Sequence, residues 1–231
     1  WSLKNINQLI ISSNSALKAL LLHCNIDNVP VIFPGVPLSP NYTKYKTLTS
    51  KKIVYFGHIF QGRGVIDLVL AFNQLVKNID DAQLILAGSN IHQPTIKIIN
   101  EIIKKSEKGD QIHILGKVKN IYRDLLSDAS VIVLPYRDIS SIKLLESLSS
   151  GRPVITTNCP GWGTDLIENG VNGYVVNRGD ITNLTKRMES LLVDPGLANR
   201  IGINGRNTII DNCLLDKNIH KLIGIFKNVK F

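Results

Sequence analysis

The first residues that could do chemistry follow the apolar run Lys52–Phe56. They form a glycine-rich stretch at residues 57–64, GHIFQGRG, which contains the cation Arg63. Glycine allows a tight turn, and a helix that begins after such a turn presents its N-terminal N–H groups to an anion. Arg63 is placed to reach a phosphate there. The stretch matches neither the G-x-G-x-x-G dinucleotide fingerprint nor a P-loop, so a plain turn with an exposed arginine explains it equally well.

Two carboxylates follow a later apolar run, Val131–Leu134. Asp138 lies in the loop after this run, and Glu146 lies eight positions further on, inside the next predicted helix. Carboxylates placed in this way can accept hydrogen bonds from sugar hydroxyls at two points of one ligand. The N–H groups of residues 139–142 would then face a diphosphate. The alternative is a helix cap at Asp138 and a surface position for Glu146.

Motifs for metal or thiol chemistry are missing from the sequence. Asp80 and Asp81 do not form an Asp-x-Asp motif, and they precede their predicted strand, which places them at the wrong end of a sheet. The cysteines are Cys24, Cys159 and Cys213, far apart and odd in number. No metal-ligand spacing or disulfide framework is visible, so we expect a reducing compartment, no cofactor and no metal.

The elements that must position these residues are short strands alternating with amphipathic helices. Strands are predicted at 8–11, 30–33, 52–56, 83–86, 111–114, 131–134, 154–156 and 174–176. This alternation predicts an α/β fold, a Rossmann-like doubly wound parallel sheet with right-handed crossovers. Ligands bind such a sheet beyond the carboxyl ends of its strands, where Arg63 and Asp138 fall.

The composition limits the class of protein and its partners. A chain of 231 residues with 44% hydrophobic residues can bury a core, and its apolar runs fall short of the ~20 residues that span a bilayer. The net charge of +9 favours an anionic partner, which includes the surface of an acidic membrane. The basic residues are scattered and match no nucleic-acid motif, so nucleic acid is not expected.

Longer stretches of the sequence resemble glycosyltransferase family 4, also called group 1. The run LLESLSSGRPVITTNCPGWGTDLIENGVNGYVV resembles the carboxyl-terminal half of these retaining, two-domain GT-B enzymes, which use sugar nucleotides. VYFGHIFQGRGVIDLVLAF looks like the family's G-R-x(4)-K-G loop, and LILAG and IHILGKV look like its next two strand ends. VIVLPYRDISSIKLLES looks like its P-S-x-x-E-G-x(6)-E stretch. The fold implied is the C-terminal domain of a GT-B architecture.

The resemblance implies a role for individual residues. Arg63, with His58, would neutralise the donor diphosphate, and Glu146 would hold the ribose hydroxyls. Asp138 would contact the donor sugar, so Asp138 and Arg63 are the catalytic candidates. The other donor-binding positions implied are Gly62, Gly116, Val118, Ser140, Ser141 and Ile142.

Some positions depart from the family pattern. Asp138 stands where the family has glutamate, and residues 139–141 (ISS) replace its Gly-Phe-Gly. His58 replaces the loop arginine and Arg63 the loop lysine, with the spacing kept. Lys143 replaces a residue that is usually apolar or small, and it either touches phosphate or is a solvated helix residue.

The resemblance also implies a division of the chain. We expect residues 1–37 to be the last βαβ of an amino-terminal acceptor domain, 38–51 a linker, 52–216 the donor-binding domain and 217–231 a C-terminal helix. The chain would be a piece of a longer polypeptide and inactive in sugar transfer when isolated.

The function implied is metal-independent transfer of a sugar, with retention, from a UDP-, GDP- or ADP-sugar to an acceptor glycan or lipid. The location expected is cytoplasmic, with peripheral contact at the membrane. Two alternatives stay open: a sugar-nucleotide-binding module without transferase activity, and a sugar-nucleotide 2-epimerase of the same architecture.

Overall fold

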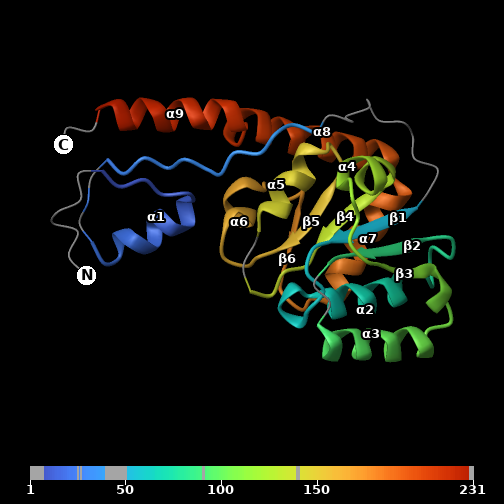
Figure 1. Ribbon diagram of the computed structural model, residues 1–231. Coiled ribbons are helices and arrows are strands. Elements are labelled where there is room, and N and C mark those ends of the chain that lie inside the picture. Colours follow the sequence, from blue (N-terminus) through green and yellow to red (C-terminus); the bar gives the residue numbers. More distant parts are fainter. Residues whose placement is uncertain are drawn as a thin grey trace.

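The computed structural model describes residues 8–24, 26, 28–39, 51–89, 92–138 and 141–228. Six strands of this part form a parallel sheet in the order β3-β2-β1-β4-β5-β6 (Figure 1). Their bounds are β1 Lys52–Phe56, β2 Gln83–Ala87, β3 Ile112–Leu115, β4 Val131–Leu134, β5 Val154–Thr157 and β6 Tyr174–Val176. The predicted Rossmann-like doubly wound sheet is therefore confirmed.

Strand β1 lies in the middle of this sheet. It pairs with β2 over five positions, from Lys52 opposite Gln83 to Phe56 opposite Ala87, and with β4 on its other edge. Every residue of β1 after Lys52 is at most 1% exposed. Parallel sheets are covered by helices on both faces, which is why their strands are continuous apolar runs in the sequence.

Helices cover both faces of the sheet. In Figure 1, α2 and α3 lie below the sheet, and α4, α5 and α8 lie above it. Helix α7 packs against α2 and reaches β4, β5 and β6. The helices are α1 Asn14–Leu21, α2 Val65–Leu75, α3 Gln93–Lys105, α4 Ile121–Asp124, α5 Ile142–Ser149, α6 Trp162–Leu166, α7 Ile181–Val193, α8 Pro195–Asn212 and α9 Leu215–Asn228. Three single 3-10 turns are η1 Gln61–Arg63, η2 Gly109–Gln111 and η3 Leu126–Asp128.

The strand order creates a crevice beside β1. The chain leaves β1 through α2 toward β2 on one side, whereas β4 leads through α5 to β5 on the other side. The connections after β1 and β4 therefore diverge, and this divergence opens a ligand crevice at the carboxyl ends of these strands.

The amino-terminal segment does not add strands to the sheet. Residues 8–11 and 30–33, both predicted as strands, share only an isolated parallel bridge between Ile11 and Val31. The prediction is wrong for these two segments, which remain at least partly exposed and have no neighbouring strand among the residues that the structure describes. Helix α1 between them packs against α6, where the backbone N–H of Ser15 donates to Oδ2 of Asp165 at 3.1 Å.

Helix α9 projects from the domain beside the segment that ends near residue 38 (Figure 1). Val36 pairs with Leu214 in a parallel bridge, and the side-chain amide of Asn218 donates to the carbonyl of Phe33 at 2.7 Å. Asn218 is the one buried residue of α9. The predicted linker lies almost wholly at 40–50, outside the described residues, so the predicted domain limits stay predictions.

The described residues contain no helix with the length and apolar character needed to cross a membrane.

Candidate functional site

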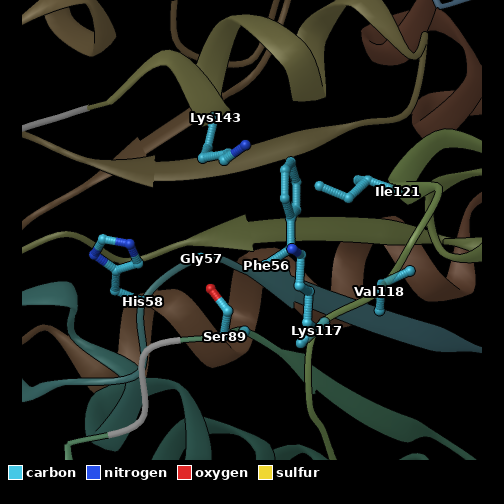
Figure 2. Close-up of a pocket in the computed structure, with 10 residues that line it drawn as sticks. Phe56, Gly57, His58, Ser89, Lys117, Val118, Ile121 and Lys143 are labelled. Carbon is cyan, nitrogen blue, oxygen red and sulfur yellow. The ribbon is translucent and has the colours of Figure 1, made fainter.

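Two cavities open at the carboxyl ends of β1, β2, β3 and β4. The larger has a volume of about 290 Å³ and is lined by Phe56, Gly57, His58, Ala87, Gly88, Ser89, Lys117, Val118, Ile121 and Lys143 (Figure 2). The smaller has a volume of about 140 Å³ and is lined by Tyr55, Gly57, His58, Arg63, Tyr136, Ser141, Ile142 and Lys143. Gly57, His58 and Lys143 line both, so the two cavities meet at these three residues.

Two glycines allow the loops around the cavities to pack closely. Gly64 ends the turn after β1 with φ of +67°, and a Cβ atom there would lie 1.7 Å from the carbonyl oxygen of Pro135. Gly88 follows β2, and a Cβ atom there would lie 2.0 Å from the carbonyl oxygen of Gly57. A side chain at either position would push the loop after β1 away from its neighbours, so glycine holds Arg63 beside the end of β4.

Arg63 is held by a carboxylate and by aromatic rings. Its Nη1 atom lies 3.3 Å from Oδ1 of Asp138, and the guanidinium carbon lies 5.2 Å from the ring centre of Tyr136 and 5.5 Å from that of Phe60. The Arg63 side chain is only 18% exposed. These contacts keep a permanent positive charge at the wall of the smaller cavity.

Backbone hydrogen bonds join the loop after β1 to the loop after β4. The N–H groups of Arg137 and Asp138 donate to the carbonyl of Gly62 at 2.9 and 3.2 Å. The Arg137 guanidinium makes two bonds to the buried Asp67 carboxylate, at 2.6 and 2.7 Å, and these bonds raise the pKa of Arg137. The backbone of Asp138 is thus held by Gly62, and the preceding residue, Arg137, is held by both Gly62 and Asp67.

Helix α5 begins at the junction of the cavities. Ser141 is its N-cap: the Ser141 Oγ accepts from the N–H of Lys143 at 3.3 Å and lies 2.8 Å from the Tyr136 hydroxyl. The alternative interpretation of Asp138 as the cap is therefore wrong. Glu146 is not a surface residue either, since its Oε2 atom lies 2.8 Å from Nζ of Lys143 and its side chain is 25% exposed.

Two buried phenols border the smaller cavity. The Tyr55 hydroxyl donates to the carbonyl of His58 at 2.5 Å, and burial raises the pKa of Tyr55 far above its ordinary value. Burial also raises the pKa of Tyr136. Both phenols therefore stay neutral at physiological pH and act as hydrogen-bonding groups rather than as charges.

The structure brings most of the predicted site residues together. His58, Arg63, Val118, Ser141 and Ile142 line the cavities, and Asp138 and Glu146 join the site through their ion pairs with Arg63 and Lys143. Gly62 packs beside Asp138, because a Cβ atom there would lie 3.1 Å from Oδ2 of Asp138. Ser140 lies outside the described residues.

Gly116 is a predicted donor-binding residue whose neighbours Lys117 and Val118 line the larger cavity. It does not line either cavity, and a Cβ atom there would meet nothing within 4 Å. The role of Gly116 in donor binding stays a prediction, because the open space for a Cβ atom shows only that no other part of the described protein approaches this glycine. Gly88, by contrast, lies close to the carbonyl of Gly57.

Sequence reasoning missed the aromatic wall and one cation of the site. Tyr55, Phe56, Tyr136 and Lys117 all line a cavity. The two residues of β1 appear in the sequence as ordinary core positions. Their position along the chain could have indicated them. Each of the four lies at or just after the carboxyl end of a strand, where ligands of such sheets bind.

The cavity walls carry a positive charge. Among the described residues, the basic side chains that line the cavities are His58, Arg63, Lys117 and Lys143. None of the described lining residues is acidic. Cavity walls that carry charge of one sign raise the local concentration of ligands with charge of the opposite sign. Across the described ranges, no group of three or more His, Cys, Asp or Glu side chains is placed to hold a metal ion.

An open parallel sheet with basic residues around the crevice at its strand-order switch defines a Rossmann-like domain whose crevice suits an anionic ligand. The model of the family "Glycosyl transferases group 1" matches residues 43–208, and the chain belongs to this family. It is 25% identical, over 181 residues, to N-acetyl-alpha-D-glucosaminyl L-malate synthase of Bacillus anthracis. That alignment covers 78% of this chain and 46% of the synthase, so the chain spans about half the length of the curated relatives it matches.

Solved structures share the fold. The Anabaena protein HepE, crystallised in complex with UDP, superposes with a TM-score of 0.84 at 16% identity, over 96% of this chain and 64% of HepE. The C-terminal domain of a glycosyl transferase group 1 protein from Francisella tularensis superposes with a TM-score of 0.66 at 19% identity. That comparison covers 77% of this chain and 97% of the Francisella domain, which supports the assignment as the C-terminal domain of a GT-B architecture.

Proposed function

We propose that this chain is the donor-binding half of a retaining, metal-independent glycosyltransferase that transfers a sugar from a UDP-, GDP- or ADP-sugar to an acceptor glycan or lipid. The observation that carries the proposal is the pair of adjoining cavities, whose walls carry cations and no described carboxylate. The retaining outcome and the acceptor class rest on the resemblance to the family, and a peripheral contact with an anionic membrane rests on the net charge of +9.

The two cavities suit the two chemical parts of a nucleoside diphosphate. The larger cavity has apolar walls from Phe56, Val118 and Ile121, which suit a base. The smaller cavity has Arg63 and the N-terminus of α5, which suit a diphosphate. The UDP in the HepE complex is a nucleoside diphosphate, the chemical class that we assign to a ligand spanning both cavities.

The carboxylates have separate roles in this proposal. Glu146 accepts hydrogen bonds from the ribose hydroxyls, and Asp138 contacts the donor sugar beyond the diphosphate. Each carboxylate already lies within 3.3 Å of a cation of the site, at Lys143 and Arg63. Ligand contacts at these four residues therefore extend one network of charges.

In the proposed reaction, negative charge develops on the diphosphate, next to the basic residues of the site. When the bond between the sugar C1 atom and the phosphate oxygen breaks, its electron pair stays on that oxygen and the diphosphate gains charge. Arg63, His58 and the N–H groups of α5 stabilise this charge more in the transition state than in the bound donor. The acceptor hydroxyl oxygen forms the new bond to C1, and its proton passes to the departing diphosphate, which has gained the negative charge.

Calorimetric titration of the chain with UDP, GDP and ADP, with and without EDTA, tests the proposal. We expect one of the three diphosphates to bind with unchanged affinity in EDTA. Loss of all binding in EDTA would overturn the metal-independent part. Absence of binding for all three, in a folded protein, would overturn the donor-binding function itself.

A further inference from the structure

Lys143 occupies the junction between the two cavities. It is the second residue of α5, and with Gly57 and His58 it lines both spaces. Figure 2 shows its side chain on the opposite side of the larger cavity from Ser89 and Lys117, directed toward the ring of Phe56. A ligand that fills both cavities must pass this ammonium group.

The surroundings of Lys143 hold its charge in place and leave it accessible. The Nζ atom lies 2.8 Å from Oε2 of Glu146 and 5.6 Å from the ring centre of Phe56, and the side chain is 31% exposed. An ammonium group has three N–H donors. It can therefore donate to Glu146 and to a ligand oxygen at the same time.

Arg63 lies away from the junction of the two cavities. It lines the smaller cavity but not the larger one, and its ion pair is with Asp138 rather than Glu146. The two cations are thus placed at different points along a ligand that spans the cavities. Lys143 stands where the nucleoside ends, and Arg63 stands further into the diphosphate part.

The geometry points to Lys143 as a ligand-binding residue that contacts the phosphate attached to the nucleoside, while Arg63 binds the terminal phosphate. This inference rests on the proposed donor-binding function and deepens it. The competing interpretation is that Lys143 only orients Glu146 and never contacts a phosphate. The two interpretations differ in how binding depends on the number of phosphates.

Titrations with ligands of zero, one and two phosphates separate these interpretations. The probes are uridine, UMP and UDP, with the guanosine and adenosine series run in parallel, and the variants are Lys143→Ala, Lys143→Arg and Arg63→Ala. The control is Lys77→Ala, because Lys77 is exposed just after α2, at the opposite edge of the sheet. NMR titration measures the weak nucleoside binding.

We expect Lys143→Ala to weaken the monophosphate and the diphosphate by the same factor, about tenfold, relative to the nucleoside. Arg63→Ala weakens the diphosphate alone. Lys143→Arg restores most of the monophosphate affinity because it restores the charge, and Lys77→Ala binds all probes like the unaltered chain.

Other results overturn the inference. If Lys143→Ala weakens the nucleoside as much as the monophosphate, Lys143 acts only through Glu146. If it leaves all three affinities unchanged, Lys143 is a solvated helix residue. If the unaltered chain binds no diphosphate in any series, the proposed function fails, and the role of Lys143 fails with it.

Discussion

At the scale of residues, two ion pairs flank the cavities: Arg63 with Asp138, and Lys143 with Glu146. Asp138 is 41% exposed and Lys143 31% exposed, so water screens both pairs. Pairs this exposed typically contribute less than about 1 kcal/mol to stability. Substitutions at these four positions are therefore expected to leave the chain folded, which makes them informative about binding.

Glu146→Ala is expected to weaken binding of a nucleoside diphosphate more than Asp138→Ala does. Glu146 is assigned to the ribose, which every such ligand carries, and loss of a charge-assisted hydrogen bond costs about 1.5–3 kcal/mol. Asp138→Ala is expected to show its effect mainly with the intact sugar nucleotide. Calorimetric titration with the diphosphate and the matching sugar nucleotide measures both effects.

The control for this comparison is Glu101→Ala, because Glu101 is an exposed carboxylate on α3. Normal diphosphate binding by folded Glu146→Ala and Asp138→Ala alike would show that the site is misplaced.

At the scale of elements, the fit of the loop after β1 against the loop after β4 decides the shape of the site. Gly64→Ala is expected to destabilise the chain by about 3 kcal/mol or more, because φ of +67° is strained for alanine and its Cβ would meet the Pro135 carbonyl at 1.7 Å. Urea unfolding measures this loss.

Gly116→Ala provides the matched control. It also lies in a loop at a carboxyl strand end, but a Cβ atom there has open space around it. We expect its free energy of unfolding to change by less than about 0.5 kcal/mol. Equal tolerance of both substitutions would contradict the close packing at Gly64.

The six strands of the sheet were predictable because parallel strands are buried on both faces. β1, β4 and β6 have the predicted bounds, and β2, β3 and β5 differ by one residue at one or both ends. The two amino-terminal segments have the same Ile and Val content but lack strand neighbours, and composition alone does not reveal that difference. Apolar runs predict a strand only where the tertiary structure supplies a partner.

The sequence predicts where in the fold the candidate site lies, but it does not predict which residues pair with its carboxylates. The sequence puts Asp138 and Glu146 after β4, yet their cations, Arg63 and Lys143, are fixed by loop packing and by a turn of α5. The three-residue spacing of Lys143 and Glu146 is the one partner signal that the sequence carried, because such residues adjoin on a helix.

At the scale of the whole molecule, buried groups that resist ionisation make the fold sensitive to alkali. Burial raises the pKa of Cys213 from its ordinary value of 9.0 to about 12. Between these values the unfolded chain has lost a proton that the folded chain keeps, so the free energy of unfolding falls as pH rises. One such thiol accounts for a loss of about 1.4 kcal/mol between pH 8 and pH 10.

Cys213→Ala tests this origin of the alkaline loss. We expect the variant to be less stable at pH 8, yet to lose less stability than the unaltered chain between pH 8 and pH 10 in urea unfolding. Cys24→Ala, which removes a thiol that is only half-buried, is the control. An unchanged pH dependence in Cys213→Ala would assign the loss to other groups, such as the buried Tyr55 and Tyr136 phenols above pH 10.

The isolated chain is expected not to transfer sugar to an acceptor. It spans about half the length of its curated relatives, and in the proposed function its crevice binds the donor alone. Positioning of two reactants can lower a barrier by about 7–11 kcal/mol, and a crevice that binds the donor alone does not position the acceptor. Transfer from a radiolabelled sugar nucleotide measures this, and efficient turnover by the 231-residue chain would contradict it.

The central place of β1 has a consequence for how fast amide protons exchange with deuterium. Its N–H groups lie inside the sheet with strands on both sides, so they exchange only when the whole domain opens. Helix α9, with Asn218 as its one buried residue, exchanges through local fraying. Both cavities begin at the end of β1, so we expect a ligand there to contact backbone that exchanges slowly, while local opening of α9 leaves that backbone undisturbed.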